Sequence, residues 1–157
     1  MTRFADAAAQ IASECYGNGI RKAARALSRI YDGELKTTGL LVSQLTVLVA
    51  AARFGEKGAP MGTIAKTLAM DPTTMTRNLH PLEVSGLLRV ARSPEDARVR
   101  YVFLTRAGER KIEEAFPLWR RAQAKVHKLV GENRADGIRA ELRRLVDRMG
   151  EPEEARK

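Results

Sequence analysis

The chain contains little of the chemistry that most enzymes use. Its 157 residues include one cysteine, Cys15, and two histidines, His80 and His127. A single cysteine excludes an intramolecular disulfide framework and an all-thiolate metal cage, and the two histidines lie too far apart to indicate a metal site. No glycine-rich phosphate loop or nucleophile–base pair is visible. We therefore expect no catalytic residues, no metal and no cofactor, and a protein that is not an enzyme.

Long hydrophobic runs are also missing. The most apolar stretch, 40–52, is interrupted by Ser43, Gln44 and Thr46, and it is shorter than the roughly 18 residues that a membrane helix requires. The N-terminal segment has no apolar core of the length of a secretory signal. These absences predict a soluble, cytoplasmic protein that does not act at a membrane.

Positive charge and apolar residues, in contrast, are plentiful. Lysine and arginine number 28 against 19 acidic residues, which gives a formal net charge of +9, and 44% of the residues are hydrophobic. The apolar fraction supports one folded core, and the length fits one domain or one core with an added oligomerisation arm. The charge predicts a polyanionic partner, with nucleic acid favoured over an anionic membrane.

The first part of the chain has apolar residues at the spacing of amphipathic helices. One helix is predicted from Ile20 onward, and two glycines separate it from a piece at 5–16. A second helix is predicted after Ser43, which suits an N-cap, and it closes at Gly55.

A helix–turn–helix is predicted at the centre of the chain. A short helix at 61–68 leads into Asp71-Pro72, where the aspartate suits an N-cap and the proline suits the first helical turn. A second helix then spans about 72–85. Pro81 lies inside this helix and predicts a kink or an early loosening near Asn78.

After this helix the apolar period changes from that of a helix to that of a strand. Residues 87–92 and 99–104 are predicted as two strands joined by a polar tip at 93–98. A long helix at 105–130, bent at Pro117, and a final helix complete the chain.

This order of elements predicts a mainly α chain with a small β-hairpin wing, an α+β fold of the winged helix–turn–helix type. We expect one chain, 1–157, with a winged lobe at 43–104 and dimerisation helices at 5–35 and 105–150. The terminal helices have more apolar surface than so small a globule can cover, which favours pairing with a second copy.

The second helix of such a motif presents its first residues to base edges in the major groove of DNA. Threonine hydroxyls can bind phosphates or bases, and arginine can bind guanine or phosphate. The alternative is a threonine-rich capping turn with one solvated arginine. The candidate residues on this helix are Thr73, Thr74, Thr76, Arg77, Asn78 and His80.

The hairpin supplies a second set of DNA-binding candidates. Arg98 and Arg100 follow the tip, and a guanidinium on a thin loop can enter the minor groove. Asp96 lies two residues before Arg98 and is predicted to orient it through a bidentate pair. The alternatives are an ordinary exposed turn for Arg98 and, for Arg100, projection to the other strand face.

Two further groups of residues are candidates for sensing. Tyr16, Tyr31, Phe116 and Trp119 can line a small-molecule cavity, although aromatic residues at helical spacing more often belong to a core. Cys15 can act as a redox-sensing thiolate if nearby cations lower its pKa. A buried structural thiol is the alternative for this residue.

From about Cys15 to Met149 the chain resembles the MarR family of bacterial transcription regulators. The resemblance rests on the stretch LLVSQLTVL and on the stretch that runs from MGTIAKTLAM to FLTRAGE. The wing carries its most specific part, the pattern D-x-R…V-x-L-T-x-x-G. The residues that match this pattern are Asp96, Arg98, Val102, Leu104, Thr105 and Gly108.

The resemblance implies a homodimer with interlocked terminal helices and two winged lobes on a pseudo-palindromic operator. It implies contacts from Thr73, Thr74, Thr76 and Arg77 on the recognition helix and from Arg98 on the wing. Family members are usually repressors, often released by a small aromatic ligand bound between the dimer helices and the DNA lobe.

Some members of the family instead sense oxidants through a cysteine in the N-terminal helix, and Cys15 lies near that position. The chain departs from the peroxide-sensing branch, because Thr46 and Val47 stand in the region where that branch has tyrosines.

The leading hypothesis is a homodimeric repressor that binds double-stranded DNA in a sequence-specific manner and that a small aromatic effector can release. One alternative is an oxidant-sensing regulator that uses Cys15. Another is a winged-helix adaptor whose basic faces bind acidic protein partners.

Overall fold

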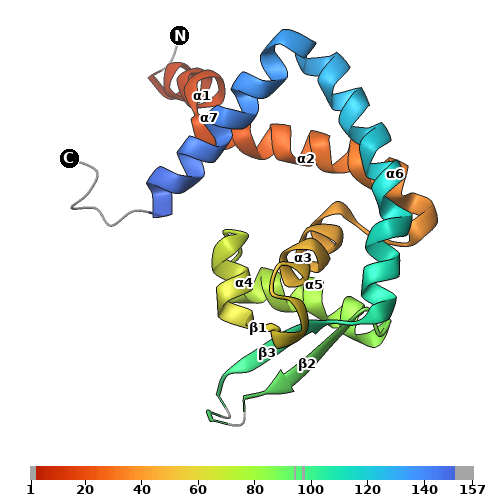
Figure 1. Ribbon diagram of the computed structural model, residues 1–157. Coiled ribbons are helices and arrows are strands. Elements are labelled where there is room, and N and C mark those ends of the chain that lie inside the picture. The colour runs from red at the N-terminus through yellow and green to blue at the C-terminus, as the bar shows by residue number, and fades with distance from the viewer. Residues whose placement is uncertain (1–2, 94, 97, 151–157) are drawn as a thin grey trace.

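The computed structural model describes residues 3–93, 95, 96 and 98–150, which fold into seven α-helices and a three-stranded sheet. Figure 1 shows the winged lobe, formed by α3 to β3, beneath an open frame of terminal helices. The mainly α fold with a small β wing is therefore confirmed. In chain order the elements are α1 (Arg3–Glu14), α2 (Tyr16–Leu35), α3 (Val42–Ala52), β1 (Ala59–Pro60), α4 (Met61–Thr67), α5 (Pro72–Val84), β2 (Leu88–Arg92), β3 (Arg100–Leu104), α6 (Arg106–Val130) and α7 (Glu132–Gly150).

Within these residues, no single helix is both long and apolar enough to cross a bilayer. One pair of segments, Tyr16–Thr38 and Val42–Ala52, meets that requirement by length and composition only when it is taken together across a bend of 76°.

The N-terminal arm consists of two helices that meet at Cys15. This residue has an extended backbone, and its Sγ accepts the N–H of Asn18 at 3.4 Å, so that it caps α2. The separate N-terminal piece is confirmed, but the expected reason for it is wrong. Gly17 and Gly19 lie inside α2, and the break occurs at the capping cysteine instead.

The start of α3 differs from the prediction. Leu41, and not Ser43, occupies the N-cap position, and its N–H donates to Oε1 of Gln44 at 2.9 Å. The next N–H, that of Val42, donates to Oδ1 of Asp32 at 2.7 Å. Because Asp32 belongs to α2, a carboxylate from the preceding helix replaces the expected serine cap and fixes α3 relative to α2.

The wing has three strands, one more than the alternation of apolar residues predicts. β2 and β3 pair in antiparallel register from Leu88–Leu104 to Arg92–Arg100, within one residue of the predicted ranges. β1 pairs with the other edge of β3, which gives the order β1-β3-β2. Two residues are too few for a period-two pattern to show in the sequence.

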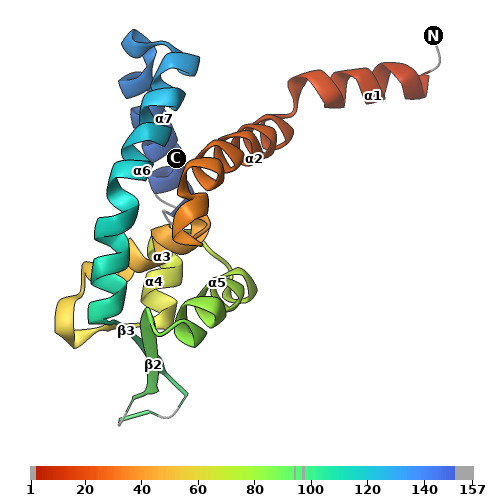
Figure 2. The ribbon, with the colours of Figure 1, turned by 90° about the vertical axis from the view of Figure 1, so that its right-hand side faces the viewer.

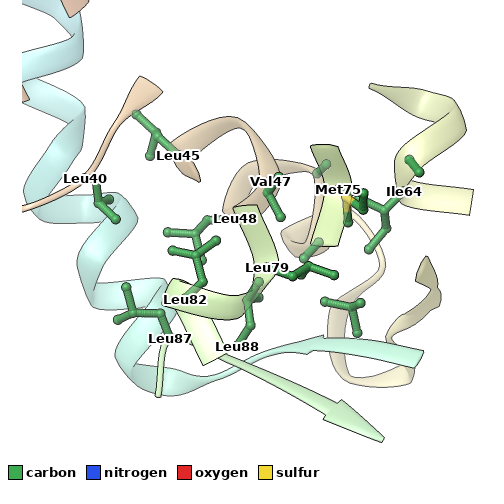
Figure 3. Packing of buried hydrophobic residues seen from close by; sticks show 14 of the residues in the cluster. Leu40, Leu45, Val47, Leu48, Ile64, Met75, Leu79, Leu82, Leu87 and Leu88 are labelled. Atoms are coloured by element: carbon green, nitrogen blue, oxygen red, sulfur yellow. The ribbon is translucent and has the colours of Figure 1, made fainter. Parts of the chain in front are cut away.

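Most of the hydrophobic core lies inside the winged lobe, and Leu35 of α2 and Ala115 of α6 also belong to it. Figure 3 shows Leu79 and Leu82 of α5 between the side chains of α3 and those of β2. Burial of one large aliphatic side chain contributes about 1.5–3 kcal/mol, so this cluster is the main source of stability of the lobe. The largest side chains with almost no exposed surface are Leu35, Leu48, Ile64, Met75, Leu82, Leu88, Val47 and Val102.

Both helices that contain an internal proline are continuous. α5 remains helical through Pro81, so the predicted loosening near Asn78 is wrong. The Asn78 side chain donates to the carbonyl of Thr74 at 2.9 Å within the same helix. α6 runs through Pro117, and Figure 1 shows it bent part-way along its length, as expected for an internal proline.

Polar contacts join α2 to α6. The carboxylate of Glu34 accepts from Nε of Arg121 at 3.2 Å and from Nζ of Lys125 at 2.5 Å. The hydrogen bond from Lys125, helped by the charges of Lys125 and Arg121, holds the pKa of Glu34 below its ordinary value. The hydroxyl of Tyr31 on α2 donates to Oε1 of Gln123, which lies between Arg121 and Lys125 on α6. The frame formed by the two helices is therefore held at several points.

Candidate nucleic-acid interface

Asp71 fixes the start of the second helix of the helix–turn–helix. Its Oδ1 accepts the N–H of Thr74 at 2.9 Å and its Oδ2 accepts the Thr74 hydroxyl at 2.6 Å. These hydrogen bonds to the charged form lower the pKa of Asp71. The turn before it contains Ala69 at a φ of 50°, a positive value that non-glycine residues seldom adopt.

α5 has one face in the core and one face in solvent. Met75, Leu79 and Leu82 are buried, whereas the residues at the opposite spacing of i, i+3, i+4 and i+7 are exposed. This exposed polar face has the spacing of a surface that enters a groove. Its members are Thr73, Thr76, Arg77 and His80.

The hydroxyl and amide candidates on α5 already bind within the helix. Thr74 donates its hydroxyl to Asp71, and Thr76 donates its hydroxyl to the carbonyl of Pro72 at 2.9 Å. Thr74 and Asn78 are also only half-exposed. The side chains of Arg77 and His80, in contrast, make no hydrogen bond or ion pair with any residue that the structure describes, so their polar groups remain available to a ligand.

The tip of the wing is organised by backbone hydrogen bonds and not by a side-chain ion pair. Oδ1 of Asp96 accepts the backbone N–H of Arg98 at 2.9 Å, so the predicted bidentate pair with the guanidinium is wrong. The carboxylate instead fixes the backbone, and the Arg98 side chain extends into solvent. Pro94 and Ala97 of the predicted tip lie outside the described residues.

Thr105 and Gly108 attach the wing to α6. The Thr105 hydroxyl accepts the N–H of Gly108 at 3.1 Å and donates to the carbonyl of Gly86 at 2.7 Å. A Cβ on Gly108 would lie 2.3 Å from the carbonyl oxygen of Leu87, so only glycine allows this close approach. These contacts explain the T-x-x-G part of the wing pattern in structural terms.

The two strands of the wing carry arginines on both faces. Arg89 lies on one face, with its guanidinium 4.0 Å from the centre of the Phe103 ring. Tyr101 stacks on Phe103 at a centroid distance of 6.2 Å on the same face. Arg100 is exposed and pairs in register with Arg92 on the opposite face. Arg98 and Arg100 therefore extend the basic surface of the hairpin toward its tip.

The structure brings the exposed face of α5 and the wing to one end of the molecule. Figures 1 and 2 both show α5 and the hairpin at the end opposite the turn between α6 and α7. α5 also packs directly against β2. The helix and the hairpin can therefore approach one duplex together.

Of the aromatic candidates, the structure brings only Phe116 and Trp119 together. Trp119 lines a cavity of about 320 Å³ between α3 and α6 and stacks on Phe116 at a centroid distance of 5.9 Å. Tyr31 binds Gln123 outside that cavity, and burial raises the pKa of its hydroxyl. Tyr16 is 87% exposed at the start of α2. The residues that line the cavity are Val42, Leu45, Thr46, Val49, Ile112, Phe116 and Trp119.

Comparison with known proteins places this geometry in a family. The family model with the description MarR family matches residues 38–99, and no curated protein matches the chain. The Mycobacterium tuberculosis transcriptional regulator MosR, in complex with DNA, has 33% sequence identity over 85% of this chain and 95% of its own, with a TM-score of 0.74. The chain belongs to the MarR family.

Two more distant structures share the fold. The transcriptional repressor CouR of Rhodococcus jostii, bound to a 23-mer DNA duplex, is 24% identical over 86% of this chain and 94% of its own, with a TM-score of 0.73. The DNA complex of MepR from Staphylococcus aureus is 19% identical over 84% and 96%, with a TM-score of 0.70. Like MosR, both show the MarR-type winged arrangement over nearly the whole chain.

Sequence reasoning missed part of this MarR-type site. The cavity walls from α3, Leu45 and Val49, are four residues apart on one helix face, a signal that the sequence contained. Arg92 was not among the candidates because it precedes the predicted tip. Its position became clear only from its register opposite Arg100.

The lone cysteine lies apart from this interface. Cys15 is exposed and caps α2 at the junction of α1 and α2. Within the described ranges, no group of three or more histidine, cysteine, aspartate or glutamate side chains could hold a metal ion. The exposed face of α5 and the arginines of the wing are therefore the candidate functional surfaces of this MarR-family chain.

Proposed function

We propose that this chain is a homodimeric repressor that binds a pseudo-palindromic operator in double-stranded DNA. The observation that carries the proposal is the exposed polar face of α5 beside the arginine-bearing wing. α5 would enter the major groove, where Arg77 can bind guanine O6 and N7 or a phosphate. Arg98 would enter the adjacent minor groove, where narrow stretches concentrate negative potential.

Exposed apolar residues on the terminal helices support the homodimer. α1 has no buried residue, and α7 projects a row of aliphatic side chains into solvent. A second copy is the partner that would cover these faces in a symmetric way. Two winged lobes related by a two-fold axis then match two half-sites of an operator. The exposed residues in question are Phe4, Ile11, Ile138, Leu142, Leu145 and Val146.

The relatives support binding to DNA. MosR, with 33% identity, was solved in complex with DNA. CouR is described as a transcriptional repressor and was solved on a duplex, although its 24% identity supports only the fold. Repression and the two-fold operator are thus our proposals for this chain, resting on its own exposed surfaces.

Binding to DNA from the protein's own upstream region tests the proposal. The wild-type protein should bind that duplex more tightly than a shuffled duplex of equal length, and its affinity should fall steeply with salt because phosphates release counterions. Arg77→Ala should cost about 1–3 kcal/mol and relax specificity at one base pair. Arg98→Ala should weaken binding while the dimer stays folded.

Arg143→Ala serves as the matched control, because it removes the same charge from an exposed position on α7. Equal affinity for the upstream and shuffled duplexes would contradict sequence-specific binding. Wild-type affinity of Arg98→Ala at matched salt would remove the wing from the proposed interface.

We also propose that a small, uncharged aromatic molecule releases the repressor by entering the cavity between α3 and α6. Its volume of about 320 Å³ lies in the range of small-molecule sites. No charged side chain lines it, and the hydroxyl of Thr46 already donates to the carbonyl of Val42 at 2.8 Å. The other polar group among the lining side chains is the indole N–H of Trp119, which carries no charge. An ionised ligand would therefore lose hydration without an opposite charge to compensate it.

The fluorescence of Trp119, the single tryptophan of the chain, reports directly on this cavity. Naphthalene should change the emission and weaken operator binding, whereas naphthoate at the same concentration should have little effect. Phe116→Ala should reduce the response to naphthalene, because it removes the stacked wall. A stronger response to naphthoate would contradict the proposal.

A further inference from the structure

Arg92 and Arg100 form the last residue pair of the β2–β3 ladder. In an antiparallel sheet, residues directly opposite each other project to the same face, with their Cβ atoms about 4.5–5.5 Å apart. Both arginines are exposed. Two permanently charged guanidinium groups therefore start from neighbouring points on one face of the wing.

That face is the one that turns toward the helix–turn–helix. Because side chains alternate along a strand, Arg92 and Arg100 share their face with Leu88 and Val102, which belong to the core. The core includes the buried side of α5, and α5 packs against β2. The arginine pair thus lies on the inner face of the wing, the face that turns toward α5. It is farther toward the wing tip than the core residues of that face.

No acidic group compensates the pair. The side chains of Arg92 and Arg100 make no hydrogen bond, ion pair or ring contact with any described residue. Of the two carboxylates at the tip, Asp96 accepts the backbone N–H of Arg98, and Glu95 makes no ion pair with a described residue. Like charges directly opposite each other in a sheet are destabilising. Arg89 on the outer face differs, because the Phe103 ring holds it. The uncompensated arginines point to an external anion.

We propose that Arg92 and Arg100 together bind one backbone phosphate of the DNA, at the base of the wing and on the side of α5. Each guanidinium can donate hydrogen bonds to phosphate oxygens, and one phosphate between them replaces repulsion by two attractions. The site would fix how deeply the wing tip enters the minor groove. This inference rests on the proposed binding of DNA but adds a contact that neither the recognition helix nor the wing tip supplies.

The experiment compares the full-length wild type with Arg92→Gln, Arg100→Gln and the double variant. Each protein is titrated into a fluorescently labelled duplex from the protein's own upstream region, at salt concentrations between about 50 and 200 mM. Each neutralised phosphate contributes about 0.9 to the slope of log affinity against log salt. If the two arginines share one phosphate, each single variant should lose most of the contribution of that phosphate to the slope, counted once for each wing. The double variant should then lose little more than either single variant.

Thermal unfolding without DNA supplies the second measurement. Removing either charge should leave the melting temperature unchanged or raise it by about 1–3 °C at low salt, because the repulsion is relieved. The difference should shrink at high salt, which screens the charges. Arg89→Gln, on the other face of the same strand, is the matched control and should lower the melting temperature while it changes the salt slope least.

Three results would overturn the shared phosphate site. They are an unchanged slope in both single variants, additive losses in the double variant, and a lower melting temperature in Arg92→Gln or Arg100→Gln. Failure of the proposed function is a different result, namely that the wild-type protein does not distinguish the upstream duplex from the shuffled one. The salt slope of non-specific binding would still measure the arginine pair in that case.

Discussion

The winged lobe and the terminal helices bury their apolar residues in different ways. In the lobe, Leu48, Ile64 and Met75 are covered completely by other parts of the same chain. α1 has no buried residue, and in the described part of α7 only Ala135 is buried. Figure 2 shows α1 extending away from the rest of the molecule. The apolar side chains of the lobe are thus buried within one chain, whereas most of those of the terminal helices α1 and α7 remain exposed to solvent.

This difference separates two sources of stability. Side chains in the lobe contribute through packing that one chain supplies, so their loss acts on the free energy of unfolding. Apolar residues of α7 contribute only when another surface covers them, so their loss should act on association. Substitutions in the two regions should therefore be read by different measurements.

Leu142→Glu tests whether α7 forms the interface between two copies of the chain, and it should have the largest effect. A charge in the centre of the apolar row would be desolvated on pairing, so the dimer should dissociate at concentrations at which the wild type stays paired. Light scattering coupled to gel filtration measures the mass. Ala140→Glu, an exposed position two residues away on the same helix, should leave the dimer intact. A dimeric Leu142→Glu would show that α7 is not the interface.

Leu82→Ala tests the lobe and should be next in size. Leu82 is 1% exposed on α5, and removal of such a side chain typically costs 2–5 kcal/mol through lost contacts and the cavity that remains. Urea unfolding at fixed protein concentration measures the change. Val84→Ala, 74% exposed on the same helix, should change stability by less than about 0.5 kcal/mol. Similar costs for the two variants would contradict the assignment of the core.

The same contrast explains which parts of the fold were predictable from the sequence. In the lobe, Asp71 and Pro72 marked the start of α5 and Gly86 its end, because caps act through local hydrogen bonds and backbone angles. The start of α3 was predicted wrongly, because its cap is Asp32, ten residues away on another helix. Local chemistry can be read from local sequence, whereas a cap that depends on packing cannot.

The candidate site divides along similar lines. The exposed face of α5 follows from helical spacing alone, since Thr73, Thr76 and Arg77 alternate with buried residues. The role of Asp96 was predicted wrongly, because the sequence spacing allows both a guanidinium pair and a backbone hydrogen bond. Only the folded structure distinguishes these alternatives, and in it Oδ1 of Asp96 accepts the backbone N–H of Arg98.

Gly108→Ala tests the junction between the lobe and α6. The added Cβ would lie 2.3 Å from the carbonyl oxygen of Leu87 and 2.6 Å from Leu104. The wing must shift to accept it, at a cost of about 1–3 kcal/mol. Gly62→Ala in α4 is the matched control, because its Cβ meets no atom within 4 Å. Urea unfolding should show a loss for the first variant and none for the second. Equal stability of the two would mean that the junction is not tightly packed.

Asp71→Ala should have a smaller effect that depends on pH, because the charged carboxylate caps α5 more strongly than the protonated one. The folded pKa of Asp71 is lowered by the hydrogen bonds from Thr74, so the cap stabilises the protein fully above the unfolded pKa of about 3.9. Its contribution is lost as the pH falls through the lower, folded pKa. The wild type should therefore be more stable than Asp71→Ala at pH 7, and the difference should narrow in acid. Asp71→Asn, which caps without a charge, should keep its advantage over alanine at every pH. A gap between wild type and Asp71→Ala that stayed constant with pH would assign the cap to shape and not to charge.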